Sequence, residues 1–205
     1  MAWLQSVTLT SSHVALEPLS QSHAADLIEA VSDGKLWELW YTSVPSPHEM
    51  SSEIDRRLGL ESAGSMLPFA VIHRESRKAV GMTTYMNVDA VHKRVEIGST
   101  WYRKAVQRTA LNTHCKLLLL AHAFETLDCI AVEFRTHFFN HQSRAGIERL
   151  GAKLDGILRS HQRARNGSLR DTAVYSIIAS EWPAVRAHLK HQLAKPRDPA
   201  VGLRP

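Results

Sequence analysis

The sequence predicts an α+β fold, in which a mixed β-sheet carries helices on both faces. Between residues 68 and 103, alternating segments follow one another through short loops, which is typical of an antiparallel meander. A long apolar helical segment then separates two strand-like segments, which is typical of a crossover between parallel strands. The chain has 205 residues, 44% of them hydrophobic and 22% charged. We expect one domain over 1–195 and a flexible tail at 196–205.

The first quarter of the chain alternates short strand and helix patterns. Residues 7–19 form two short alternating pieces of an edge strand, and residues 20–31 carry apolar side chains at helical spacing after a capping serine. Residues 49–63 return to helical spacing. The loop between the two helices carries three aromatic residues, which are Trp37, Trp40 and Tyr41. One strand and two helices are therefore expected before the meander.

The meander consists of three segments that alternate with period two, at 68–74, 79–88 and 95–103. Because the loops between them are too short for a crossover connection, neighbouring strands are expected to run antiparallel.

The crossover follows the last strand of the meander. Asn112 is a good N-cap residue, and the segment from there to Leu127 is apolar on nearly every face, so we expect a buried helix. Residues 130–136 then alternate as a strand. Asn140 caps a shorter helix, which ends at Gly151 in a left-handed conformation.

The chain closes with a hairpin and a helix. Residues 153–163 and 171–179 are separated by a turn that contains Asn166-Gly167, the strongest short-range signal for a hairpin. A last helix is expected over 181–193.

The start of the long helix is the expected ligand site. It opens at the carboxyl end of a strand, where the first N–H groups of a helix lack acceptors and the helix dipole adds positive potential. Such a helix end binds phosphate or pyrophosphate readily. Arg103, Lys104 and Arg108 add positive charge in the same loop.

Charge and composition argue against other classes of protein. The net charge of +5 comes from basic residues that are spread along the chain, without the stripe or aromatic interleaving of a nucleic-acid binder. Cys115 and Cys129 form neither a disulfide framework nor a metal cluster. No apolar run approaches the ~18 residues of a membrane span, so we expect a cytoplasmic protein without membrane or nucleic-acid partners.

An ordered set of motifs resembles the GNAT superfamily of N-acetyltransferases, within it the branch of the ribosomal-protein N-terminal acetyltransferases. The resemblance covers roughly residues 7–182. The motifs are Glu96-Ile97-Gly98 with Trp101, the loop from Gln107 to Asn112, Ala123-Phe124-Glu125, Asn140 with Ser143, Leu150-Gly151-Ala152, Asp155-Gly156 with Leu158-Arg159, and Asn166-Gly167 with Arg170-Asp171. Each is weak alone, but their order and spacing fit throughout.

The resemblance implies a three-layer fold in which the fourth and fifth strands of the central sheet splay apart. It also implies acetyl-CoA as the acyl donor, with its pantetheine arm in the splay and its pyrophosphate on the N–H groups of the loop before the long helix. The implied cofactor-binding residues are Trp101, Arg103, Gln107, Arg108, Thr109, Ala110, Leu111, Asn112, Asn140 and Ser143.

The implied phosphate loop departs from the family pattern. Thr109, Ala110 and Leu111 stand where glycines are expected, and glycine allows a positive φ and a close approach of the backbone to the pyrophosphate. The backbone is therefore expected either to stay in ordinary regions or to hold the pyrophosphate more loosely.

Glu96 is the candidate general base, because the superfamily often places its base on this strand. The alternative is a half-exposed glutamate that pairs with Arg94 or Lys93, while His73 and His92 are weaker candidates. Many members carry a tyrosine acid seven residues after the asparagine that matches Asn140, where this chain has Ile147. Ser143 is the alternative donor to the departing thiolate, or else it supports the cap of its helix.

The acceptor is expected to be a primary amine, and Trp37, Trp40 and Tyr41 are candidates to line its cleft together with Glu96. Trp101 is a further candidate, and all these aromatic residues can equally be core. A polypeptide N-terminal α-amine is the first expectation and a small amine, such as a polyamine or an amine-bearing antibiotic, is the second. A catalytically idle acyl-CoA sensor is the alternative of another class. A homodimer is compatible with the sequence.

Overall fold

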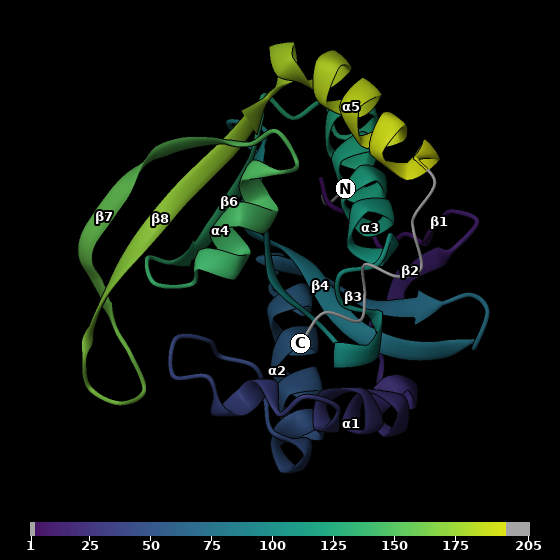
Figure 1. Cartoon of the computed structure of the whole chain (residues 1–205), viewed down its shortest axis with the longest axis vertical. Coiled ribbons are helices and arrows are strands. Elements are labelled where there is room, and N and C mark those ends of the chain that lie inside the picture. Colours follow the sequence, from purple (N-terminus) through teal and green to yellow (C-terminus); the bar gives the residue numbers. More distant parts are fainter. Residues whose placement is uncertain (1–2, 196–205) are drawn as a thin grey trace.

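The computed structural model describes residues 3–195, and its strands form one eight-stranded mixed sheet (Figure 1). Across the sheet the strand order is β1-β2-β3-β4-β5-β6-β8-β7. The strands are β1 (Leu9–Thr10), β2 (Val14–Pro18), β3 (Met66–His73), β4 (Lys78–Asp89), β5 (Arg94–Tyr102), β6 (Ala131–His137), β7 (Lys153–Arg163) and β8 (Leu169–Ile178). The predicted tail at 196–205 lies outside the described residues, and the domain boundary at 195 stays a prediction.

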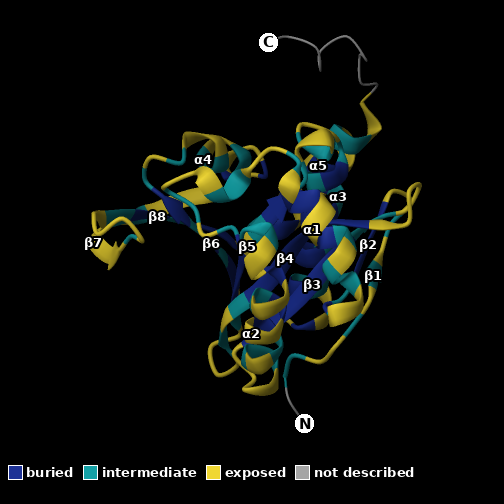
Figure 2. Cartoon of the chain, turned by 90° about the horizontal axis from the view of Figure 1, so that it is seen from below, coloured by how far each residue is buried: buried dark blue, intermediate teal, exposed yellow. Residues whose placement is uncertain are grey.

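Helices cover both faces of the sheet, which confirms the predicted fold class (Figure 1). The helices are α1 (Ala24–Ser32), α2 (Met50–Ser62), α3 (Leu111–Ala121), α4 (His141–Glu148) and α5 (Trp182–Ala194). Side chains of α3 and α5 share one core cluster with Val95 and Ile97 of the sheet. Side chains of α1 and α2 share the other cluster with Met82 and Trp101. The central strands of the sheet are therefore buried between two helical layers, as Figure 2 shows.

The long helix is shorter than the sequence predicted. The α-helix ends at Ala121 and not at Leu127, and a π-helical turn continues it from His122 to Thr126. In that turn the N–H of Leu127 donates to the carbonyl of His122 at 3.0 Å, which is the wider i→i−5 bond.

The strands β5 and β6 are parallel and separate after three register pairs, which confirms the predicted splay. The pairs are Arg94↔Ala131, Val95↔Val132 and Glu96↔Glu133. Beyond them β5 pairs with β4 alone, through a bulge in which Ser99 and Thr100 face a single residue of β4. Ser99 of this bulge has a φ of 48° and lies beyond the last residue of β5 that pairs with β6.

The closing hairpin forms as predicted, with β7 as the outer strand of the sheet. Its turn is closed by the N–H of Ala164, which donates to the carbonyl of Ser168 at 2.8 Å, and Gly167 takes a φ of 84°. Nearly all of β7 is exposed (Figure 2). None of the helices in residues 3–195 is long and apolar enough to cross a membrane.

Candidate active site

The start of α3 has no side-chain cap. Its N-cap residue is Ala110, and the first carbonyl of the helix accepts from His114 N–H at 3.0 Å. The prediction that Asn112 is the cap was wrong, because Asn112 lies inside the helix and its Oδ1 accepts from the hydroxyl of Tyr102 at 3.0 Å. Within the described residues, the N–H groups of Asn112 and Thr113 therefore have no acceptor.

The loop before α3 keeps a left-handed residue although it lacks the glycines of the family pattern. Arg108 has a φ of 60°, whereas Ala110 has an ordinary φ of −68°. The hydroxyl of Thr109 accepts from Leu111 N–H at 3.2 Å and donates to the carbonyl of Val106 at 2.7 Å. The turn is thus held by a threonine side chain, and the strain that glycine would avoid falls on Arg108.

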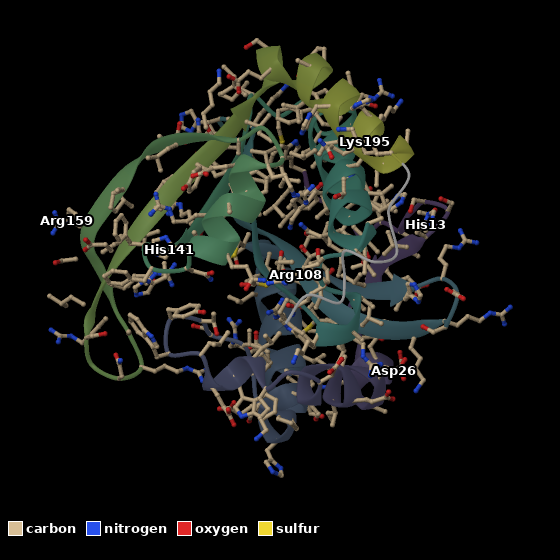
Figure 3. The ribbon with its side chains drawn as sticks, viewed as in Figure 1. His13, Asp26, Arg108, His141, Arg159 and Lys195 are labelled. Atoms are coloured by element: carbon tan, nitrogen blue, oxygen red, sulfur yellow. The ribbon has the colours of Figure 1, made fainter. Side chains whose placement is uncertain are left out.

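Two predicted cofactor residues are occupied elsewhere. The guanidinium of Arg103 pairs with Asp33 and with Glu29 of α1, both at 3.2 Å. Trp101 is buried in the core cluster under α1 and α2, and its indole N–H has no partner within the described residues. Arg108 remains exposed at the loop before α3 (Figure 3).

A second arginine reaches the start of α3 from a distant part of the chain. The guanidinium of Arg149, just after α4, donates to the hydroxyl of Thr113 at 3.3 Å through two nitrogens. The sequence analysis missed this residue, since nothing in its spacing relates it to a loop 40 residues earlier. Arg108 and Arg149 together place two positive charges at the open helix end.

The start of α4 is capped as predicted. Asn140 accepts from Ser143 N–H through its Oδ1 at 3.0 Å, and Gly151 takes the expected left-handed conformation with a φ of 101°. The hydroxyl of Ser143 itself makes no hydrogen bond within the described residues, and the side chain is half-buried. It is therefore available as a donor beyond the end of β6.

Glu96 lies at the last register pair before β5 and β6 separate, and it is only 5% exposed. Its Oε2 accepts from the amide of Asn87 at 2.7 Å and lies 3.5 Å from the guanidinium of Arg135. The alternative of a half-exposed glutamate that pairs with Arg94 or Lys93 was wrong. Burial raises the pKa of this carboxyl, while Asn87, Arg135 and Arg170 act in the opposite direction.

The two weaker histidine candidates lie at strand connections, His73 at the end of β3 and His92 in the turn between β4 and β5. His73 contacts the hydroxyl of Ser76 in the turn after β3, at 3.2 Å. His92 contacts Asp89 in the turn between β4 and β5, at 2.8 Å.

The three aromatic residues predicted to line the acceptor cleft lie in two different places. Trp40 is 50% exposed and packs edge-on against His137, with ring centroids 4.9 Å apart, beside Tyr41 and Phe139. This brings the loop between α1 and α2 to the carboxyl end of β6. Trp37 instead packs against the core cluster of α1 and α2.

A cavity of about 440 Å³ lies next to this aromatic group, between the end of β6 and the hairpin. Its walls include His137, Phe138, Phe139, Ile157, Arg159 and Leu169. Figure 3 shows Arg159 on the outer strand of the hairpin.

His137 is a buried histidine with an unused donor. It is 3% exposed, and its Nδ1 accepts from the N–H of Phe139 at 3.1 Å, so the neutral ring carries its proton on Nε2. Within the described residues, Nε2 has no hydrogen-bond partner. Burial lowers the pKa of this imidazole and the charge of Arg170 lowers it further, so the ring stays neutral near pH 7.

Lys116 is a buried cation that the sequence analysis missed. It is 6% exposed, and its Nζ donates to the hydroxyl of Thr100, in the bulge of β5, at 3.1 Å. No carboxylate pairs with it among residues 3–195. Burial lowers the pKa of the ammonium to about 8.

The comparisons with known proteins agree with this architecture. Residues 13–153 match the model of the acetyltransferase (GNAT) domain. A GCN5-related N-acetyltransferase from Brucella melitensis is 29% identical, with a TM-score of 0.85 over 96% of this chain and 90% of that chain. No curated protein matches the sequence.

Two structures of RimL, a ribosomal L7/L12 α-N-protein acetyltransferase, show the same fold at 19% identity. The apo form has a TM-score of 0.75 over 85% of this chain and 96% of that chain. A form in complex with coenzyme A has a TM-score of 0.71, and the match covers 84% of this chain and 98% of that chain.

The family model covers more than half of the chain, and the splayed strands and the open start of α3 fit a coenzyme with a diphosphate. The chain therefore belongs to the GNAT acetyltransferase family, and it is an N-acetyltransferase that uses acetyl-CoA.

Proposed function

We propose that the protein acetylates a protein or peptide N-terminal α-amine by direct attack of the amine in the splay between β5 and β6. The observation that carries the proposal is the position of Glu96, at the last register pair before the strands separate. Its buried carboxyl and the open start of α3 lie at the two ends of the same strand, β5. When bound, acetyl-CoA supplies an activated acetyl thioester.

The start of α3 would hold the diphosphate. The N–H groups of Asn112 and Thr113 have no acceptor in the described residues, and Arg108 and Arg149 add two charges at this helix end. In the proposed site the backbone of Gln107–Leu111 shapes the turn, and Asn140 positions the first turn of α4. Arg103 and Trp101 have no part in it, because the first is paired with α1 and the second is core.

Glu96 would accept the proton of the amine through water. Its pKa is raised by burial, so its carboxylate is a stronger base than that of an ordinary glutamate. An α-amine with a pKa near 8 costs about 1 kcal/mol to deprotonate at pH 7, whereas a lysine amine near 10.4 costs about 4.6 kcal/mol. A relayed carboxylate therefore suits an α-amine better.

Ser143 would donate its hydroxyl proton toward the departing thiolate. The hydroxyl is free of other partners in the described chain and lies in the first turn of α4, three residues after the cap. Because Ile147 stands where other members carry a tyrosine, a serine is the candidate donor in this helix.

Exposed aromatic side chains support a peptide acceptor over a polyamine. Trp40 and Phe139 line an open surface beside the cavity, as an extended chain requires. The cavity wall carries Arg159 and Asp171, which pair with each other at 2.6 Å, whereas a polycation favours a pocket with an excess of acidic residues. A small amine is the second candidate, and a homodimer stays a prediction.

The test is release of free coenzyme A thiol from acetyl-CoA with a panel of peptides and small amines. We expect Glu96→Gln to lower kcat/KM by about 100-fold, since a general base contributes about 10²–10⁴-fold. The decrease of kcat/KM at acid pH, which reflects protonation of the base, should be absent in this variant. Ser143→Ala is expected to lower kcat about tenfold. Glu75→Gln, in the exposed turn after β3, is the control and should match the wild type. Coenzyme binding without acetylation of any amine would instead favour the idle sensor.

A further inference from the structure

The face of the sheet that carries the proposed base also carries a guanidinium whose charge acts on that base. Arg170 of β8 donates through Nε to the hydroxyl of Thr172 at 3.2 Å. Thr172 is the register partner of His137 on β6, so Arg170 and His137 lie on the same face. Arg170 is half-buried, and within residues 3–195 it has no salt bridge to a carboxylate.

Three neighbouring arginines already have carboxylate partners. Arg135 pairs with Glu133 at 2.9 Å and approaches Glu96, and Arg94 pairs with Glu133 from the other side. Arg159 pairs with Asp171 at 2.6 Å. Asp155 accepts from the hydroxyl of Ser176 at 3.0 Å, whereas the charge of Arg170 acts on Glu96 without a salt bridge in the described residues.

His137 adds an unused neutral donor on the same face. Its Nε2 is buried without a partner in the described chain, although a buried donor that makes no hydrogen bond costs about 1–3 kcal/mol. Its ring also lines the cavity between β6 and the hairpin. The two terminal nitrogens of the Arg170 guanidinium and Nε2 of His137 therefore make no hydrogen bond in the described residues, on the same face of the sheet as Glu96.

We propose that the amine acceptor carries a carboxylate a few bonds from its reacting nitrogen, and that Arg170 binds this carboxylate with His137 as a second donor. The proposal rests on the proposed function, because it takes the amine to lie at Glu96. A carboxylate supplies the missing counter-charge of Arg170 and the missing acceptor of Nε2. The carboxylate can belong to a free amino acid or to an acidic side chain next to a peptide N-terminus.

The test compares acceptors that differ only in this charge. One pair is serine and serinamide, and the other is a peptide that begins Ser-Asp and the same peptide that begins Ser-Asn. We expect the charged member of one pair to have a kcat/KM at least tenfold higher with the wild type. The preferred pair identifies the source of the carboxylate.

Substitution of the arginine should remove that preference. With Arg170→Gln the two members of the preferred pair should react within about twofold of each other, and Arg170→Lys should keep part of the difference. His137→Phe should reduce the preference without abolishing it. Arg163 is an exposed arginine of the same hairpin, and Arg163→Gln should retain the full wild-type preference. This control distinguishes a direct contact with Arg170 from the general positive potential of the hairpin.

Coenzyme A binding, measured by calorimetry, and thermal unfolding show whether each variant is folded. If Arg170→Gln does not fold, the wild-type comparison decides alone, since equal rates with charged and neutral members overturn the proposal while acetylation stands. A preference for spermidine over all four acceptors also overturns it. If the protein binds coenzyme A but acetylates no amine, the proposed function fails and this inference fails with it.

Discussion

The helices α3 and α4 follow the two strands that splay apart, and an asparagine stands near the start of each, yet the two helix ends are built differently. Asn140 caps α4 by accepting from Ser143 N–H. Asn112 lies inside α3 and accepts from the hydroxyl of Tyr102 instead. One helix start is satisfied by its own chain, and the other keeps free N–H groups.

The two helices also differ in the burial of their charged side chains. Lys116 lies in the second turn of α3, buried and without an acidic partner in the described chain, whereas Glu148 and the other charges at the end of α4 are exposed. A helix that keeps open N–H groups and a buried positive charge gives up stability in favour of an anionic ligand. We infer that the start of α4 is built for stability and the start of α3 for binding the coenzyme, although the apolar face of α3 belongs to the core.

The largest expected effect concerns Lys116. We predict that Lys116→Met raises the free energy of unfolding by about 3 kcal/mol at pH 7, because it removes the cost of burying an ammonium. The lowered pKa means that the unfolded chain binds more protons between about pH 8 and 10.5, so wild-type stability gains on the variant as pH rises through that window. Urea unfolding at a series of pH values measures the difference.

The exposed Lys190→Met on α5 is the matched control, and it should change stability by less than about 0.5 kcal/mol at every pH. A stability difference for Lys116→Met that is the same at pH 7 and pH 10.5 would show that the ammonium is not destabilised by burial.

The next effect concerns the open end of α3. Ala110→Asp should cap the helix, raise the free energy of unfolding by about 1 kcal/mol and weaken coenzyme A binding about 100-fold, because the carboxylate occupies the N–H groups and repels the diphosphate. Calorimetric titration with coenzyme A and thermal unfolding measure both changes. Ala110→Asn is the control for the charge, and it should stabilise the helix with a smaller loss of affinity. Unchanged affinity in Ala110→Asp would place the diphosphate elsewhere.

The smallest effect concerns the capped end of α4. Asn140→Ala should lower the free energy of unfolding by about 1 kcal/mol, since Ser143 N–H loses its acceptor. Asn140→Ser, which retains a capping oxygen, should recover most of the loss in the same denaturant series. If the alanine and serine variants are equally stable, the cap contributes nothing and the contrast between the two helices is weaker than we infer.

Local sequence signals predicted much of the fold. The short loops of the meander, the Asn-Gly turn of the hairpin and the cap at Asn140 depend on residues close in the chain, and each is present in the structure. Family resemblance predicted the splay after Glu96. The cap at Asn112 failed because Tyr102, ten residues away, takes its side-chain oxygen and Thr109 takes the N–H of Leu111.

The candidate site was only partly predictable. Glu96, Arg108, Asn140 and Ser143 were identified from the family motifs, and the structure places them around the splay or at the helix starts. Trp37 and Trp40 differ by three residues in the chain, but one packs in the core and the other against His137. Pairings across the sheet decide this, and a single sequence does not contain them.

By itself the sequence determined the order of strands and helices, the loop lengths and the family, because these depend on periodicity, turn chemistry and motif spacing along the chain. Only the tertiary structure decided which charges are matched. It pairs Arg103 with α1, brings Arg149 to α3, and leaves Lys116 and Arg170 without carboxylate partners in the described residues. The reason is that an ion pair depends on distance in space and on burial, and both are set by how the layers pack.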